Sequence, residues 1–267
     1  MPSRASSETH PDEIADFIHG PPTSTPIQMY TFSPAWDLPT AGPFGLKLEA
    51  CLRMLNVRYE RHFENDVRKG PKRKSPWIVD ADVSIGDTEL ILAHVERRLG
   101  KALDAHLSRA AKARAHLVRR ALEEHFHQAF ECELVLDDRG FAVLRQLIGP
   151  RLPAPFDGLA LRMMRSGFKK HLYERGLARH TPQEIVAMGC ADVDALVELL
   201  GESPWFAGDQ PSKVDASAFG LLAVAIRSQL PTPICSHARS QERLVRYVDR
   251  ALGHWFPEFA AQASNAT

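Results

Sequence analysis

The 267-residue sequence has few of the features that mark specialised classes of protein. Its four cysteines (Cys51, Cys132, Cys190 and Cys235) are too few and too scattered for a disulfide framework or a structural zinc site. No stretch approaches the roughly 20 consecutive apolar residues that a membrane-spanning helix needs. These absences favour a protein of the reducing cytoplasm with no membrane span and no structural metal.

The sequence also lacks an excess of charge of either sign. It contains 33 Lys and Arg residues and 33 Asp and Glu residues, so its formal net charge is zero. This balance removes the bulk electrostatic attraction on which general binding to nucleic acid or to an anionic membrane depends.

The histidines do not indicate a metal site either. His125 and His127 would point to different sides of a helix and so could not bind the same ion. We therefore expect neither a nucleic-acid partner nor a metal site.

The first 26 residues are rich in Ser, Thr and Pro and contain no apolar segment of the kind found in a secretory signal. Only Ile14, Phe17 and Ile18 could pack against a folded body, within a short helical turn over residues 12–19. We predict a flexible N-terminal extension over residues 1–26.

Residues 27–100 combine strand and helix signals in the order of a small α/β domain. A helix is predicted to start at Pro43, because proline is favoured at the first helical position. Asp87 and Thr88 are both suited to cap a second helix. Strands are predicted at residues 27–32, 57–63, 77–79 and 83–85, which gives the order β-α-β-β-β-α with a basic loop over residues 68–74.

From residue 101 to residue 267 the strand signal disappears, and Gly and Pro separate segments of helical periodicity. Ser212 and Asp215 have the spacing of a capping box, which we interpret as the structural start of a core helix. The sequence therefore predicts an α/β domain followed by an all-α domain, with the boundary near Gly100. Helices are predicted within residues 103–135 and at residues 141–148, 155–174, 181–200, 215–229 and 241–252.

Five motifs in this order resemble the glutathione transferase superfamily, and within it the failed-axon-connections and metaxin-like branch. The resemblance runs from about residue 27 to residue 259 and implies a thioredoxin-like N-terminal domain followed by an all-helical domain. The motifs are MYTFSPAWDLP with GPFGLKLEACLRM (residues 29–39 and 42–54), KSPWI (74–78), IGDTELI (85–91), GLARHTPQEI (176–185) and WFAGDQPSKVDA (205–216).

The resemblance implies a glutathione site in the first domain. The residue before a cis-proline would pair with the cysteinyl part of glutathione, and this role falls to Ser75 and Pro76, although an ordinary trans-proline at the start of an edge strand is the alternative. Asp87 would bind the ammonium of the γ-glutamyl group, and Thr88 with the helix amides would bind its carboxylate. The same pair could serve only as a helix cap, or could serve both purposes.

The group that activates the glutathione thiol is less evident. Where the related S-P-F-C pattern has Ser and Cys, this chain has Gly42 and Gly45, so both side chains are missing. Backbone amides at the start of the helix could lower the thiol pKa, and Gly42 would let the sulfur approach closely. The candidate catalytic hydroxyls are Tyr30, which strand alternation could equally bury, and Thr40, which lies nearer the helix start.

Two functions remain open from the sequence. The first is an enzyme that uses glutathione to conjugate or cleave a hydrophobic electrophile, with Trp36 either in the substrate cleft or in the core. The second is a non-catalytic binding or assembly protein with the same fold, of the metaxin-like type. The resemblance also implies a homodimer that uses glutathione as a substrate. The cytoplasmic location and the absence of a metal are the expectations drawn from composition above.

Overall fold

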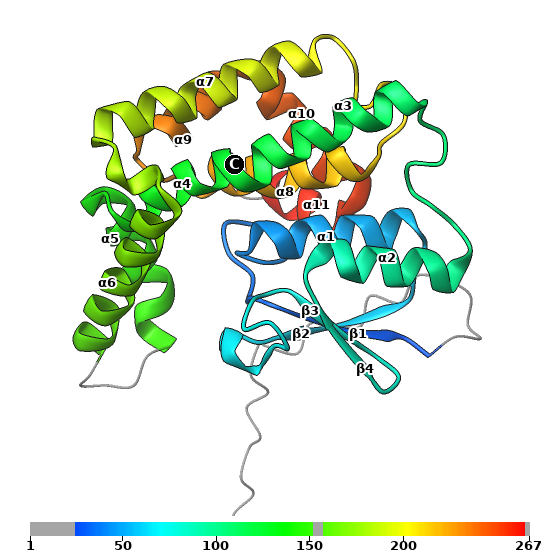
Figure 1. Ribbon diagram of the computed structural model, residues 1–267, viewed down its shortest axis with the longest axis horizontal. Coiled ribbons are helices and arrows are strands. Elements are labelled where there is room, and N and C mark those ends of the chain that lie inside the picture. Colours follow the sequence, from blue (N-terminus) through cyan, green and yellow to red (C-terminus); the bar gives the residue numbers. More distant parts are fainter. Residues whose placement is uncertain (1–24, 152–156, 265–267) are drawn as a thin grey trace, which may run out of the picture.

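The computed structural model describes residues 25–151 and 157–264, so all but the last two residues of the predicted N-terminal extension lie outside the described part of the chain. A four-stranded sheet lies at one side of the molecule, two helices cover one of its faces, and a larger helical unit packs on those helices (Figure 1). The predicted fold class, a thioredoxin-like α/β unit followed by an all-α unit, is confirmed.

The sheet has the strand order β2-β1-β3-β4. β1 pairs in parallel with β2, while β3 pairs antiparallel with both β1 and β4. The predicted order β-α-β-β-β-α is therefore confirmed, with a helix after β1 and another after β4. The bounds are β1 Ile27–Thr31, α1 Pro43–Met54, β2 Tyr59–Phe63, β3 Trp77–Asp80, β4 Val83–Gly86 and α2 Thr88–Leu99.

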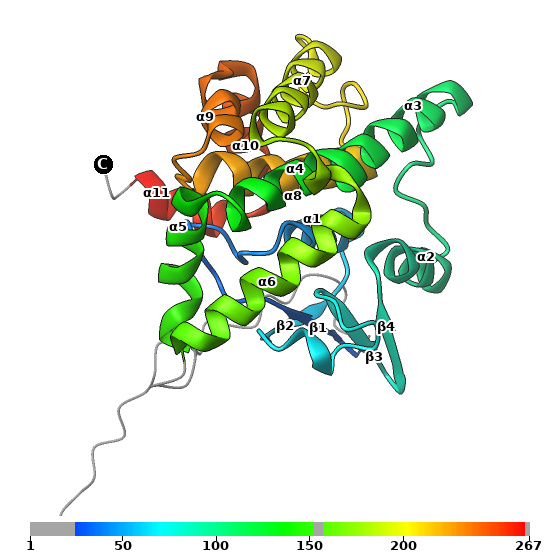
Figure 2. The ribbon, with the colours of Figure 1, turned by 60° about the vertical axis from the view of Figure 1, so that its left-hand side comes forward.

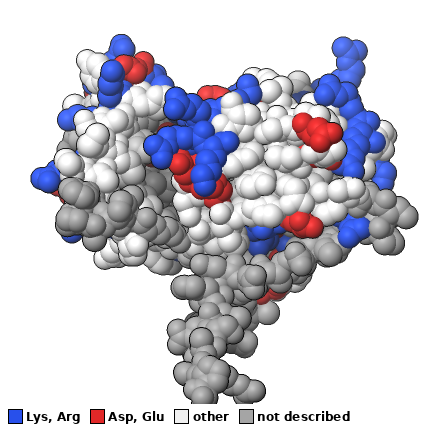
Figure 3. Space-filling view, turned by 90° about the horizontal axis from the view of Figure 1, so that it is seen from below, with Lys and Arg blue, Asp and Glu red and all other residues white. Residues whose placement is uncertain are grey.

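The two faces of the sheet differ in what covers them. Along β1, Ile27, Met29 and Thr31 are buried, while Gln28 and Tyr30 alternate with them and are half-buried on the other face. The connection from β2 to β3 consists of a 3-10 turn at Val67–Lys69 and the predicted basic loop, so it contributes no α-helix to cover this other face. Figure 3 shows Lys and Arg side chains gathered on the side of the molecule where this loop lies in Figure 1.

The second unit contains helices joined by loops and no β-strand in its described residues, as predicted. The stretch predicted as helical over residues 103–135 begins at Arg109 and contains a π-helical segment, and two helices near the C-terminus were missed. The predicted helix start at Pro155 lies outside the described residues. The bounds are α3 Arg109–Arg120, the π segment η2 Ala121–Phe126, α4 His127–Val135, α5 Asp138–Ile148, α6 Asp157–Arg175, α7 Pro182–Leu200, α8 Lys213–Arg227, α9 Pro233–Ser240, α10 Glu242–Trp255 and α11 Pro257–Ser264, with 3-10 turns at Gly149–Arg151 and Leu177–Arg179.

Helix α8 is the centre of the core, because every residue from Val214 to Ile226 is buried. Helix α1 packs along it, and one continuous apolar cluster runs through both units. The division between residues 27–100 and 101–267 therefore stays a prediction. Helices α5 and α6 extend from the rest of the helical unit on the side where α1 begins (Figures 1 and 2). No helix in the described residues is long and apolar enough to cross a membrane.

The capping box predicted at the start of α8 is confirmed. The backbone N–H of Ser212 donates to Asp215 Oδ2 at 2.9 Å. The other carboxylate oxygen, Oδ1, accepts from the backbone N–H of Phe206 at 2.6 Å, so Asp215 also fixes the loop between α7 and α8. Burial raises the pKa of Asp215 to about 6.

Candidate functional site

Helix α1 begins without a capping side chain. Gly42 is its N-cap residue and Pro43 its first helical residue, as the sequence predicts. The N–H of Gly42 donates to Thr40 Oγ1 at 3.1 Å, and the Thr40 hydroxyl also shares a hydrogen bond of 3.1 Å with the hydroxyl of Thr31. Thr40 is completely buried, so its hydroxyl holds the loop before α1 against strand β1.

Gly45 explains why the family's cysteine is missing from α1. A Cβ atom at Gly45 would overlap Thr31 Oγ1 and would lie 2.9 Å from Thr40 Cγ2. A Cβ atom at Gly42 would lie 2.8 Å from Cδ2 of the Phe32 ring. The paired threonines occupy the space that a side chain would need at Gly45, and the Phe32 ring occupies it at Gly42. The two glycines therefore fit how α1 packs on its neighbours.

The peptide bond between Ser75 and Pro76 is cis, as the resemblance implies. It lies immediately before β3, and Pro76 is buried. The Ser75 hydroxyl is also buried, and it makes no hydrogen bond within the described residues. A buried hydroxyl without a partner is uncommon in folded proteins and fits a place that a ligand completes.

The start of α2 holds the other predicted glutathione contacts. Asp87 is exposed and caps the helix, because its Oδ1 accepts from the N–H groups of Glu89 at 3.0 Å and Leu90 at 3.2 Å. Its φ of 82° is unusual for a residue with a side chain. Thr88 is 7% exposed, and its Oγ1 accepts from Lys47 Nζ of α1 at 3.0 Å. This bond places the start of α2 beside the first turns of α1.

Lys47 belongs to an ionic cluster that the sequence analysis missed. Its Nζ also donates to Glu89 Oε1 at 2.7 Å and to Glu123 Oε1 of the π segment at 2.8 Å. Burial alone would raise the pKa of Glu89, but the hydrogen bond from Arg119 and the charge of Lys47 outweigh it and lower the pKa to about 2.

Glu123 connects this cluster to the helical unit. It accepts from Ser217 Oγ of α8 at 2.6 Å and from Arg120 Nη2 at 2.8 Å. The cluster therefore joins α1, α2, the π segment and α8. A lysine between two leucines inside an apolar helix (residues 46–48) was the signal in the sequence that could have indicated it.

The two remaining candidates lie in strand β1 and in the loop that precedes α1. Tyr30 lies on the face of the sheet opposite α1 and stacks between His62 and Trp77, with ring centroids 4.9 and 5.1 Å away. Trp36 forms a tight turn with Asp37 at φ values near 57° and 56°, and its half-buried ring packs against the core. The predicted catalytic role of Tyr30 and the predicted substrate-cleft role of Trp36 stay predictions.

Helix α4 supplies the residues that face the start of α1 from the helical unit. The Phe44 ring meets the His127 ring edge-on, with centroids 5.0 Å apart. Burial, together with the positive charges of Arg175 and Lys74, lowers the pKa of His127 to about 3, so this imidazole is neutral at pH 7. Burial raises the pKa of the nearby Glu131, which accepts from Arg175 at 3.5 Å.

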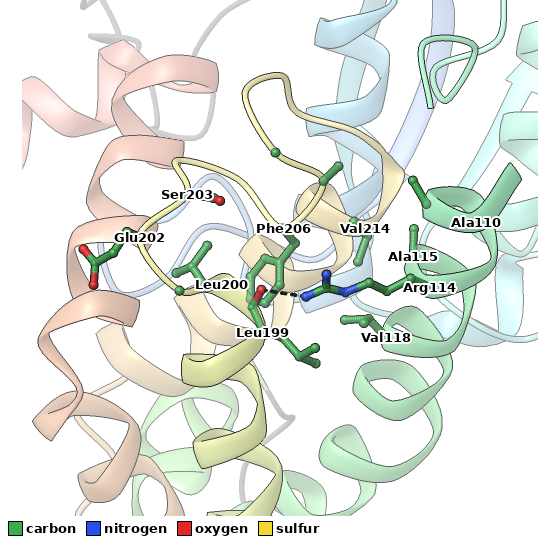
Figure 4. Close-up of a pocket in the computed structure, with 14 residues that line it drawn as sticks. Ala110, Arg114, Ala115, Val118, Leu199, Leu200, Glu202, Ser203, Phe206 and Val214 are labelled. Carbon is green, nitrogen blue, oxygen red and sulfur yellow. Dashed lines mark hydrogen bonds between the residues drawn. The ribbon is translucent and has the colours of Figure 1, made fainter. Parts of the chain in front are cut away.

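A separate cavity of about 510 Å³ lies between α3 and the loop that joins α7 to α8 (Figure 4). Arg114 crosses it and donates to the carbonyl oxygen of Leu199 at 3.1 Å, and Phe206 and Val214 line it from the other side. None of the predicted site residues lines it. The described residues also contain no group of three or more side chains that could hold a metal ion.

Two family models match the chain. The Glutathione S-transferase N-terminal domain matches residues 43–140, which include α1, the Ser75–Pro76 bond and the start of α2. The Glutathione S-transferase C-terminal domain matches residues 189–251. The chain belongs to the glutathione transferase superfamily.

Relatives within this superfamily include enzymes and other proteins. The chain is 26% identical over 235 residues to isoprene-epoxide–glutathione S-transferase of Rhodococcus sp. (strain AD45), which covers 84% of this chain and 97% of that protein. It is 26% identical to Failed axon connections of Drosophila melanogaster, in an alignment that covers 87% of this chain and 59% of that protein. It is 24% identical to metaxin-1 of Mus musculus, over 88% of this chain and 76% of that protein. The last two match the branch that the motifs resemble.

A solved structure agrees with the fold of this transferase-superfamily chain. The β-etherase of Sphingobium sp. strain SYK-6 is 15% identical and aligns with a TM-score of 0.59, over 88% of this chain and all of that chain. At this identity the likeness concerns the fold alone.

Proposed function

We propose that the chain is a glutathione transferase that conjugates glutathione to, or uses it to cleave, a hydrophobic electrophilic small molecule. The observation that carries the proposal is the bond between Lys47 and Thr88, which brings the uncapped start of α1 beside the start of α2. Two adjacent helix N-termini suit a ligand that carries a thiolate at one end and a carboxylate at the other. In this assignment Asp87 binds the ammonium of the γ-glutamyl group.

Backbone amides are the proposed activators of the thiol. The N–H groups of Phe44 and Gly45, in the first turn of α1, have no hydrogen-bond acceptor within the described residues. Such amides, at the positive end of a helix dipole, stabilise a thiolate more than a thiol and lower its pKa. The thiolate sulfur would then attack an electrophilic carbon, and the leaving group or the opened epoxide oxygen would take the electron pair.

The second substrate is proposed to bind between the start of α1 and helix α4. Phe44 and the neutral His127 offer an aromatic surface there, and Trp36 is the further candidate that the sequence suggested. The name of the Rhodococcus relative supports an epoxide as one class of electrophile to test.

One observation favours the alternative, a non-catalytic binding or assembly protein of metaxin-like type. The packing of Gly45 against Thr31 and Thr40 leaves no side-chain donor for the thiol at that position of α1. If backbone amides do not suffice to activate the sulfur, the fold would bind glutathione without turning it over.

Calorimetric titration with glutathione, run beside turnover assays with chlorodinitrobenzene and with a small epoxide, separates these functions. The enzyme predicts saturable binding, a bound thiol with a lowered pKa, and turnover of at least one electrophile. Binding with an unshifted thiol pKa and no turnover would establish the alternative. No binding at all would exclude the transferase and leave an assembly protein that does not use glutathione.

The assembly and location of the enzyme are also proposals. The homodimer rests on the family resemblance, and sedimentation of the purified chain would test it. A cytoplasmic location follows from the reasoning on cysteines and charge, and fractionation of cells would test it.

A further inference from the structure

All three N–H groups of the Lys47 ammonium donate hydrogen bonds within the protein. A lysine ammonium donates three hydrogen bonds and accepts none. In this chain the three acceptors are Glu89 Oε1, Glu123 Oε1 and Thr88 Oγ1, at 2.7, 2.8 and 3.0 Å. The side chain of Lys47 is only 1% exposed, so water does not compete for these bonds.

The direction of the bond between Lys47 and Thr88 fixes the role of the Thr88 hydroxyl. Because Nζ can only donate, Thr88 Oγ1 must accept, and the hydroxyl proton points in another direction. Within the described residues this proton has no acceptor. A buried ammonium behind the hydroxyl also polarises the O–H bond and makes it a stronger donor to an anion.

From this geometry we infer that Lys47 is a positioning residue for glutathione, which orients and polarises Thr88 to donate to the α-carboxylate of the γ-glutamyl group. The inference rests on the proposed function and adds a residue to its site. Lys47 itself does not touch the ligand. It acts through Thr88 Oγ1, while Glu89 and Glu123 hold its ammonium in place.

The cluster keeps this arrangement rigid. Glu89 remains ionised at neutral pH, since Arg119 and Lys47 lower its pKa to about 2. Glu123 is fixed by Ser217 and Arg120. Two carboxylates from different elements therefore confine the lysine, and the ammonium does not have to be ordered when the ligand binds.

A pair of ligands isolates the contact. Glutathione and γ-aminobutyryl-cysteinyl-glycine differ only in the α-carboxylate, so the ratio of their dissociation constants measures recognition of that group. We expect the wild type to prefer glutathione. Lys47→Met and Thr88→Val should each reduce this preference about tenfold, as expected for one charge-assisted hydrogen bond. Thr88→Ser should retain it, because the hydroxyl is kept.

The control removes a different buried cation. Arg61 of β2 is 7% exposed and pairs with Glu49, in a cluster on the far side of α1 that does not include Thr88. Arg61→Met should leave the ratio of affinities at the wild-type value, even if it lowers thermal stability. A general loss of stability would weaken both ligands alike and leave the ratio unchanged.

Calorimetric titration of the five proteins (the wild type and four variants) with both ligands decides the matter. An unchanged ratio in Lys47→Met would overturn the inference while the proposed function stands. If Lys47→Met does not fold, Lys47→Gln takes its place, and an unchanged ratio there overturns the inference. An unchanged ratio in Thr88→Val overturns it as well, because it excludes the hydroxyl as the donor. Failure of the wild type to bind glutathione would overturn both the proposed function and this inference.

Discussion

Gly220 of α8 lies directly against the carbonyl oxygen of Pro43 at the start of α1. A Cβ atom at Gly220 would overlap that oxygen and would lie 3.2 Å from the backbone nitrogen of Lys47. The backbones of α1 and α8 therefore meet without side chains between them. This contact between residues 177 positions apart sets where the proposed thiol-binding amides lie relative to the helical unit.

Replacing this glycine should damage both stability and the site. Gly220→Ala should lower the free energy of unfolding by about 1–3 kcal/mol, because α1 must move away from α8 to admit the methyl group. Glutathione affinity should fall as well, since the start of α1 moves with it. Chemical denaturation and calorimetry measure the two effects. Gly253→Ala on α10, where a Cβ meets open space, is the control. It should raise stability by up to about 1 kcal/mol through helix propensity and leave glutathione affinity unchanged.

The charge of Asp87 should matter more than its capping bonds. Asp87→Asn keeps a side-chain acceptor for the amides of Glu89 and Leu90, so stability should change little. Glutathione affinity should fall by about 1.5–3 kcal/mol, because the charge-assisted bond to the ligand ammonium is lost. Calorimetry with glutaryl-cysteinyl-glycine, which lacks that ammonium, should detect no such loss. Equal loss for both ligands would rule out this assignment.

The sulfur offers a further test. Tyr30 stacks on the face of the sheet opposite α1, and Thr40 is buried with its hydroxyl already bonded. We therefore expect Tyr30→Phe and Thr40→Val to leave the pKa of bound glutathione unchanged, although Thr40→Val should cost about 1–3 kcal/mol of stability through the unpaired Gly42 amide. Thiolate absorbance followed against pH measures the pKa. A rise of about one unit in either variant would identify that hydroxyl as the donor.

Restoring the family's cysteine at Gly45 should fail for a steric reason. Gly45→Cys should destabilise the protein by about 1–3 kcal/mol, because the new Cβ meets Thr31 Oγ1 and Thr40 Cγ2. Thr31→Ala in the same chain removes the first of these atoms and should recover part of the loss. Thermal denaturation of the single and double variants measures this. Equal stability of Gly45→Cys and the wild type would show that the threonine pair can move aside.

Features set by neighbouring residues could be predicted from the sequence. Pro43 at a first helical position, the Asp87 cap and the capping box at Ser212 all depend on bonds within a few residues. The β-rich run at residues 27–32 likewise predicted strand β1, although it could not say on which face Tyr30 would lie.

Features set by distant residues could not be predicted in this way. Helix α9 was missed because its first turn has no local side-chain cap, and Glu133 of α4 instead accepts from the N–H of Ile234 at 2.8 Å. The Lys47 cluster was missed for the same reason, since Glu123 lies 76 positions away in the sequence and contacts Lys47 from a π segment. A single sequence names such residues but does not show which of them meet.

The pH dependence of stability should report the environment of His127. Its pKa is lowered to about 3 in the folded chain, against about 6.5 when unfolded, so between these values the unfolded chain binds one more proton. Stability should therefore fall as the pH drops through this window, by about 2 kcal/mol at pH 5 from this residue. His127→Gln should remove that part of the slope, whatever it does to stability at pH 7, and urea denaturation from pH 7 to pH 4.5 measures it. His116→Gln, at an exposed position of α3, should keep the wild-type slope. An unaltered slope in His127→Gln would mean that this imidazole accepts a proton in the folded protein.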